Sequence, residues 1–133
     1  MEIFSLFKRL WRRTRPLLQA PTTGGQAEDL AAEYLRHQGL RILERNYRCR
    51  QGELDLICRD GNTVVFVEVR LRQSAQHGGA AASVTHKKRQ RIVKAARHWL
   101  SQQAASPCRF DCVVLDQLTP EAITWIRHAF DEQ

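Results

Sequence analysis

Three acidic side chains stand in the two segments of the chain with the strongest β-forming character, GELDLICR and VVFVEVRLR. Side chains alternate between the two faces of a strand, so Glu53 and Asp55 are expected on one face, about 7 Å apart. Leu54 and Leu56 are then expected on the other face. Glu68 stands in the second segment, where valines occupy the alternate positions. Acidic residues are depleted in strands, so these three suggest a chemical role.

A tight turn is predicted between the two segments. The pair Asp60-Gly61 is a strong hairpin signal, and it makes the segments antiparallel neighbours. Counting outward from the turn brings Asp55 beside Glu68 on one face of the sheet. Arg70 lies two residues beyond Glu68 and shares that face. The sequence therefore predicts a pair of carboxylates with a fixed positive charge next to them.

Carboxylates crowded in this way repel each other, and partial burial increases the repulsion. A divalent cation between them would relieve it, and oxygen ligands completed by water molecules are what Mg²⁺ accepts. Such an ion, Mg²⁺ or Mn²⁺, could activate a water molecule and neutralise charge on a phosphate. The alternative interpretation is that the acids occupy the solvent face of a half-covered sheet and pair with nearby arginines.

The elements that must position these residues alternate in type along the chain. Apolar residues recur at helical spacing over residues 26–38 and again over 85–103, where Thr85 suits the N-cap position. Strands are predicted over residues 40–50, 52–59, 64–72, 108–116 and 122–126. Residues 73–84 are predicted to form a loop. The order is helix, three strands, helix and one or two strands, which indicates a mixed α/β fold with helices packed on its sheet.

Basic residues outnumber acidic ones, and several of them fall in the second predicted helix. The chain of 133 residues carries 21 Lys and Arg against 14 Asp and Glu, a formal net charge of +7. Such a surface favours polyanions, with nucleic acid first and an anionic membrane face second. The helix residues that we expect to bind nucleic acid are Lys87, Lys88, Arg89, Arg91 and Lys94. The alternative is a solvated face that only keeps the protein soluble.

The ends of the chain and its cysteines limit other interpretations. Residues 1–23 are predicted to be a basic extension and linker, and the compact domain is expected over residues 24–133. Apolar and basic residues at helical spacing over 3–18 leave open a membrane-surface adaptor, although no stretch approaches the roughly 18 apolar residues of a membrane span. Cys108 and Cys112 would lie about 13 Å apart in a strand, too far for one zinc ion. We expect free thiols and a cytoplasmic protein.

Several segments, in order, resemble the YraN family of small bacterial proteins over residues 24–130. They are EDLAAEYL from Glu28 with Gly39, ILERNY from Ile42, GELDLI from Gly52, VFVEVR from Val65, GGAAASVT from Gly78, KRQR from Lys88, AARHWL from Ala95 and CRFD from Cys108. The family in turn resembles the archaeal Holliday junction resolvases, within the PD-(D/E)xK nuclease superfamily. The resemblance implies a restriction-endonuclease-like, resolvase-like core with the element order given above.

The resemblance also implies which residues form the site. Carried over position by position, Glu28, Asp55 and Glu68 become metal ligands and, together with Arg70, catalytic residues. Glu53 belongs to the GE(I/L)D motif of the YraN family and is a candidate additional ligand or supporting group. Related resolvases work as dimers on two-fold symmetric junctions, so a homodimer is implied as well.

Arg70 departs from the superfamily pattern, which has lysine at this position. An arginine stays charged and cannot act as a base, although it can stabilise charge on a phosphate. Lys87 or Lys88 could supply a compensating ammonium. We therefore predict a Mg²⁺-dependent, endonuclease-like protein of DNA metabolism, with branched DNA as a candidate substrate. The second hypothesis is a non-catalytic nucleic-acid-binding module that retains the nuclease fold.

Overall fold

The computed structural model describes residues 23–72 and 84–132, which form two α-helices, a short 3-10 helix and five strands. In chain order the elements are α2 (Thr23–His37), β1 (Arg41–Cys49), β2 (Gly52–Asp60), β3 (Thr63–Leu71), α3 (His86–Leu100), β4 (Cys108–Leu115), η2 (Pro120–Ala122) and β5 (Ile123–Phe130). This order confirms the mixed α/β fold predicted from the sequence.

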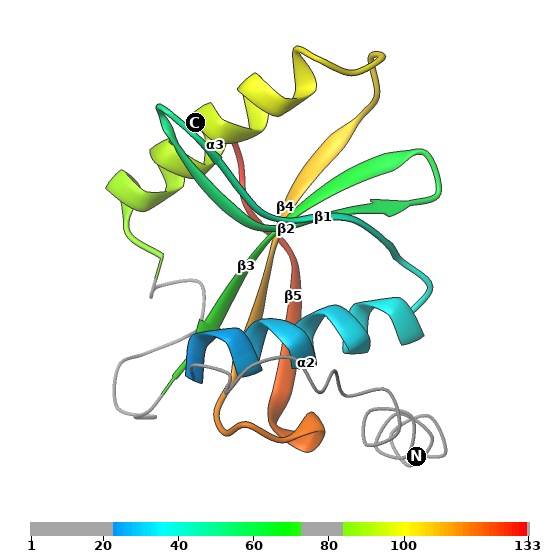
Figure 1. Ribbon diagram of the computed structural model, residues 1–133, viewed down its shortest axis with the longest axis vertical. Helices are drawn as coiled ribbons and strands as arrows, with labels where there is room; N and C mark the ends of the chain where they lie inside the picture. Colours follow the sequence, from blue (N-terminus) through cyan, green and yellow to red (C-terminus); the bar gives the residue numbers. More distant parts are fainter. Residues whose placement is uncertain (1–22, 73–83, 133) are drawn as a thin grey trace.

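The strands form one sheet in the order β1-β2-β3-β4-β5. β3 and β4 are parallel, whereas the other neighbouring pairs are antiparallel. A parallel pair needs a crossover connection, and α3 lies in it. The helices α2 and α3 cover opposite faces of the sheet (Figure 1). The described residues are therefore arranged in three layers.

Each face of the sheet has its own apolar core. The core on the α2 side contains Ala27, Leu30, Ala31, Leu35, Leu56, Val65, Val67, Val113 and Leu115. The core on the α3 side contains Leu54, Ile57, Val64, Phe66, Ile92, Val93, Ala96, Trp99, Phe110 and Val114. β3 and β4 contribute to both cores because their side chains alternate between the two faces.

The predicted element ends differ from the observed ones in a few places. α2 begins at Thr23, so its first turn includes Gly24, which we expected before the helix. A helix anchored by buried side chains extends one residue at a time at little cost, even though a helical glycine costs about 1 kcal/mol. α3 ends at Leu100 rather than at residue 103, and β5 continues to Phe130 rather than to residue 126. Residues 1–22 and the predicted loop over 73–83 lie outside the described residues.

The predicted hairpin between β2 and β3 is confirmed. Asp60 pairs with Thr63, and Gly61 has a φ of 60°. Glycine adopts this left-handed conformation without strain because it lacks a Cβ. The tight turn sets the register of the two strands, which pairs Leu56 with Val67 at the far end of the ladder.

Beyond that pair the prediction of strict alternation in β2 was wrong. Leu54 packs in the core on the α3 side, whereas Leu56 packs on the α2 side, although we expected both on one face. The β2–β3 ladder ends at Leu56, and β2 continues paired with β1 alone. The strand is free to twist where it leaves β3, and this twist redirects its side chains.

A buried acid in the CRFD segment stabilises the edge of the sheet. Asp111 is fully buried and accepts hydrogen bonds from Arg109 Nε to both carboxylate oxygens, at 3.1 and 3.2 Å. Trp125 Nε1 and the backbone N–H of His128 donate to it as well, at 2.9 and 3.1 Å. His128 has a φ of 50°, near the irregularity in the β4–β5 pairing. Asp111 therefore holds an unusual backbone in β5.

Candidate functional site

The predicted pair of carboxylates meets where β2 separates from β3. Asp55 is next to Leu56, the β2 residue of the ladder pair farthest from the turn. Its Oδ2 accepts a hydrogen bond of 2.8 Å from the backbone N–H of Val69. The two acids also act directly on each other, since the charge on Asp55 raises the pKa of Glu68. The adjacency of Asp55 and Glu68 is therefore confirmed.

Burial disfavours charge on both acids, and the charge on Asp55 disfavours it further on Glu68. Burial, followed by the charge on Asp55, raises the pKa of Glu68 to about 7, against the opposing effect of Lys88. Burial also raises the pKa of Asp55, while the N–H of Val69 and the charge of Lys88 lower it. Glu68 is only 5% exposed. Two desolvated carboxylates in contact form a site that attracts a cation.

Glu28 approaches the pair from α2, on the other side of the sheet. It is 9% exposed, and burial followed by the charge on Asp55 raises its pKa. Arg45 opposes that shift, with its Nε and Nη2 each 3.4 Å from Glu28 Oε1, and the side chain of Asn46 adds a hydrogen bond. The three predicted acids thus interact through Asp55.

Our sequence reasoning missed Arg45 and Asn46. Both belong to the ILERNY segment of β1, which carries part of the family resemblance but contains none of the predicted site residues. Asn46 has a φ of 53°, a left-handed conformation that asparagine tolerates better than most residues. An asparagine beside an arginine within a predicted strand was the signal that could have identified them.

Lys88 is the basic residue closest to the pair, because its Nζ lies 3.2 Å from Glu68 Oε1. The start of α3 sets its position, since the backbone N–H of Lys88 donates to the Thr85 side chain at 3.1 Å and caps the helix. Arg70 acts on the same acid, because its charge lowers the pKa of Glu68. An ammonium and a guanidinium therefore accompany the carboxylates.

A close contact fixes the distance between α3 and the sheet. A Cβ placed on Gly52 would lie 2.4 Å from the backbone oxygen of Arg91, closer than real Cβ contacts allow. Only glycine lets the helix backbone approach β2 to this extent. This contact explains the glycine of the GELD motif, since a more distant helix would withdraw Lys88 from Glu68.

Glu53 lies at the margin of the site. Its side chain is 49% exposed and pairs with Arg48, whose Nε is 3.5 Å from Glu53 Oε2. The residues Glu53, Lys88, Arg91 and Ile92 line a small hollow beside α3. The charge on Glu53 raises the pKa of Asp55, although it is the last of the causes of that shift. Glu53 thus influences the pair from the surface.

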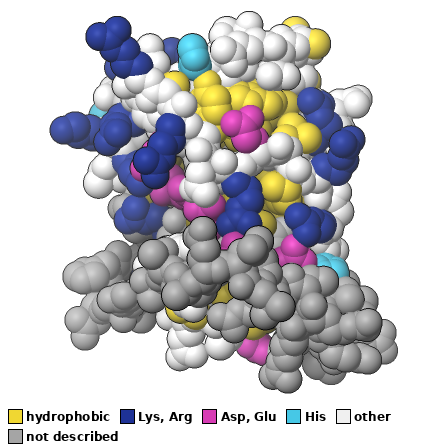
Figure 2. Space-filling model, viewed as in Figure 1, with side chains coloured by type: hydrophobic (Ala, Val, Ile, Leu, Met, Phe, Trp, Pro, Cys, Tyr) yellow, Lys and Arg dark blue, Asp and Glu magenta, His cyan; other side chains and the backbone are white. Residues whose placement is uncertain are grey.

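The basic residues of α3 fall into separate groups. Lys87, Arg91 and Lys94 are exposed, whereas Lys88 turns toward Glu68. Arg89 turns toward the end of the sheet, where its Nε donates to the Val84 carbonyl at 3.0 Å and its guanidinium lies 5.5 Å from the Phe130 ring centroid. Figure 2 shows Lys and Arg side chains spread over the visible face, with acidic side chains among them.

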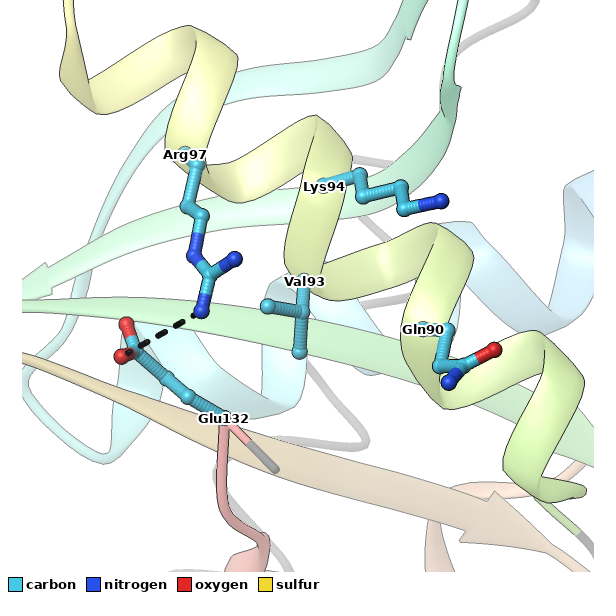
Figure 3. A pocket seen from close by; sticks show the side chains of 5 residues that line it. All are labelled: Gln90, Val93, Lys94, Arg97 and Glu132. Atoms are coloured by element: carbon cyan, nitrogen blue, oxygen red, sulfur yellow. Dashed lines mark ion pairs between the residues drawn. The ribbon is translucent and has the colours of Figure 1, made fainter.

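A second hollow lies on the other side of α3. It is lined by Gln90, Val93, Lys94, Arg97 and Glu132. In Figure 3 the Arg97 side chain points to Glu132, with Arg97 Nη2 4.0 Å from Glu132 Oε2. This hollow carries both signs of charge, and its lining includes none of the three predicted metal ligands.

The donor set at the β2–β3 separation suits a hard divalent cation. Asp55 and Glu68 offer carboxylate oxygens, and Mg²⁺ is commonly bound by one or two carboxylates with several waters retained. Among the residues that the structure describes, no cluster of three or more His, Cys, Asp or Glu could itself hold an ion. Asp55 and Glu68 are the two acids that could hold such an ion directly, and Glu28 could reach it through water.

Comparison with known proteins places the chain in a family. Residues 27–115 match the model described as Uncharacterised protein family UPF0102. The chain belongs to the UPF0102 family. A UPF0102 protein of Nitrosomonas europaea is 52% identical over 114 residues, which cover 85% of this chain and 97% of the relative. A UPF0102 protein of Dechloromonas aromatica is 55% identical over 107 residues, which cover 80% of this chain and 87% of the relative.

A third UPF0102 relative, from Alkalilimnicola ehrlichii, is 49% identical over 123 residues, which cover 89% of this chain and 95% of the relative. Membership of UPF0102 confirms the YraN-like resemblance read from the sequence. The matched segment contains Glu28, Asp55, Glu68 and Lys88. The likeness to resolvases remains a prediction.

Two further properties bear on the expectations from the sequence. No helix within residues 23–72 and 84–132 is long and apolar enough to cross a membrane. The cysteines are free thiols, and burial raises the pKa of Cys58 and of Cys112 to about 12. Such thiols are inert, so these two serve the core rather than the chemistry of the site.

Proposed function

We propose that this UPF0102 protein is a Mg²⁺- or Mn²⁺-dependent, endonuclease-like protein with a resolvase-like PD-(D/E)xK core, and that it acts on DNA. The observation that carries the proposal is the meeting of Asp55 and Glu68 where β2 leaves β3, with Lys88 Nζ 3.2 Å from Glu68. The pKa values of both acids are raised by burial, the condition that a bound cation would relieve. Perturbed acids with a specific charged partner are typical of functional sites.

The residues around the pair have distinct roles in this proposal. A divalent cation held by Asp55 and Glu68 would supply an activated water and neutralise charge on the phosphodiester. Arg70 provides a fixed charge for the phosphate as negative charge develops on it. Lys88 provides an ammonium beside Glu68, which the guanidinium of Arg70 cannot replace. Glu28, held by Arg45 and Asn46, orients water near Asp55.

The proposed substrate is DNA, with branched DNA preferred. The exposed Lys87 and Arg91 of α3 support a nucleic-acid substrate because they offer charge to a phosphate backbone beside the carboxylates, and Lys94 adds charge farther along the helix. The resolvase likeness adds a homodimer acting on a two-fold symmetric junction. Base-specific contacts are not part of the proposal, since phosphate contacts position a protein without reading sequence.

A second function is a nucleic-acid-binding module that retains the fold without catalysis. The observation that favours it is Arg70 at the position where the superfamily has lysine. In addition, the ion pair between Lys88 and Glu68 already neutralises one of the two carboxylates. Cleavage and binding must therefore be measured separately.

The deciding experiment is cleavage of labelled four-way-junction, flap and linear DNA with Mg²⁺ or Mn²⁺, beside gel-shift binding in EDTA. We expect metal-dependent cleavage that Asp55→Asn and Glu68→Gln abolish. Glu132→Gln removes an exposed carboxylate of the same charge and should leave cleavage unchanged. Binding without cleavage, equal in all variants, would refute the nuclease and support the binding module. No binding to any of the three DNAs would refute both functions.

A further inference from the structure

The β1–β2 hairpin lies along α3 and is fixed to it at two points. Near the C-terminal end of the helix, Trp99 Nε1 donates to Glu44 Oε1 at 3.2 Å. At the hairpin end, Gly52 lies against the backbone of Arg91, where an added Cβ would be 2.4 Å from the carbonyl oxygen. These contacts attach both ends of the hairpin segment to the helix. The distance between the hairpin and α3 is therefore fixed.

The hairpin carries exposed arginines at the end where Gly52 contacts α3. Arg48 is 78% exposed and pairs with Glu53 at 3.5 Å. Glu53 in turn lines the hollow that also contains Lys88 and Arg91. Arg50, in the turn of the hairpin, is exposed as well. Arg48 is thus joined through Glu53 to a hollow that is also lined by Arg91 and by Lys88, the partner of Glu68.

We propose that Arg48 and Arg50 form, with Arg91, a phosphate-binding wall that holds the DNA backbone beside the carboxylate site. The occupant is the sugar–phosphate backbone, bound through its charge. Glu53 forms an ion pair with Arg48 when DNA is absent, and a phosphate of the DNA replaces Glu53 as the partner of Arg48. Glu53 is thus a group that competes with the substrate for Arg48, in place of the metal-site role predicted from its motif.

The charges on the two sides of α3 explain why we place the DNA backbone on the side that faces the β1–β2 hairpin. The sequence of α3, HKKRQRIVKAARHWL, contains no acid. On the opposite side, Arg97 is paired with Glu132 and the hollow in Figure 3 does not include Lys88. On the hairpin side the hollow reaches Lys88, which touches Glu68. A backbone bound there would run directly from the wall to the carboxylates.

The inference rests on the proposed function, and salt dependence tests it separately. The full chain is titrated in EDTA with a labelled four-way junction and a labelled linear duplex, at several salt concentrations. The slope of log K against log[salt] is negative, and each lost phosphate contact reduces its magnitude by about 0.9. We expect this loss for Arg48→Gln, which corresponds to about eightfold weaker binding at 0.1 M salt if the variants converge at 1 M. Arg50→Gln should behave in the same way.

The matched control is Arg41→Gln, an exposed arginine near the other end of β1, which should keep the wild-type slope. Equal slopes for the Arg48 and Arg41 variants would overturn this inference alone, since the wild type would still bind. Absence of binding by the wild type would overturn the proposed function as well. Thermal melts check that each variant is folded. Because Arg48 is exposed, Arg48→Gln should leave the Tm unchanged.

A double variant distinguishes a direct contact between Arg48 and a phosphate from an indirect effect, in which Arg48 only neutralises the charge of Glu53. We compare Arg48→Gln combined with Glu53→Gln against Glu53→Gln alone. If Arg48 binds phosphate, the slope of the double variant is smaller in magnitude, by about 0.9, than the slope of Glu53→Gln alone. Identical slopes would show that Arg48 only masks Glu53, and the inference would be wrong.

Discussion

Replacing Glu68 with glutamine should stabilise the protein at alkaline pH in the absence of divalent cations. Glu68 is 5% exposed, and burial and Asp55 raise its pKa to about 7 from an ordinary value of 4.5. The unfolded chain therefore loses the proton first as pH rises. Between about pH 4.5 and 7 the folded state holds more protons than the unfolded state, so stability falls with rising pH. A neutral glutamine at this position removes that loss.

The size of the effect follows from the two pKa values. A difference of about 2.5 pH units between 4.5 and about 7 corresponds to about 3 kcal/mol. For a domain of this size that is a rise in Tm of roughly 10 °C for Glu68→Gln at pH 8. At pH 4 the carboxyl is protonated in both states, so the variant and the wild type should have nearly equal stabilities.

The assay is urea unfolding in EDTA at a series of pH values between 4 and 8, repeated with Mg²⁺ at pH 8. We expect the wild type to lose stability across this range and to regain it with Mg²⁺, while Glu68→Gln gains much less from the ion. Glu132→Gln, at an exposed position that does not act on the pair, serves as the control and should follow the wild type. Parallel profiles for the wild type and Glu68→Gln would refute the electrostatic reasoning behind the metal site.

Two further predictions concern the contacts that position α3. Gly52→Ala should lower the free energy of unfolding by about 1–3 kcal/mol and reduce cleavage, because the new Cβ would meet the Arg91 backbone at 2.4 Å. Gly24→Ala, which has nothing within 4 Å, is its control and should not destabilise the protein in thermal melts. Lys88→Ala should reduce cleavage at least tenfold, and adding Arg70→Lys should restore part of it, with a shifted pH–rate profile. If Arg70→Lys restores nothing, Lys88 only neutralises Glu68 and has no role in proton transfer.

Local sequence signals predicted most elements because each depends on residues close together in the chain. Thr85 marked the start of α3 through its capping bond, and Asp60-Gly61 marked the hairpin. The short turn also decided the register, so counting along the chain from the turn was enough to pair Asp55 with Glu68. The same local argument failed for Leu54, because the twist of β2 beyond the ladder depends on which partner strands it retains.

The sequence by itself determined the order of helices and strands, the family, and the meeting of two carboxylates at one hairpin. It could not show that α2 and α3 bring Glu28 and Lys88 to those carboxylates from opposite faces of the sheet, because helix placement depends on packing between distant segments. Nor could it separate Arg89, which lies over Phe130, from the exposed Arg91 two residues later. Tertiary contacts decided both, since burial and the distance between charges exist only once the layers are packed.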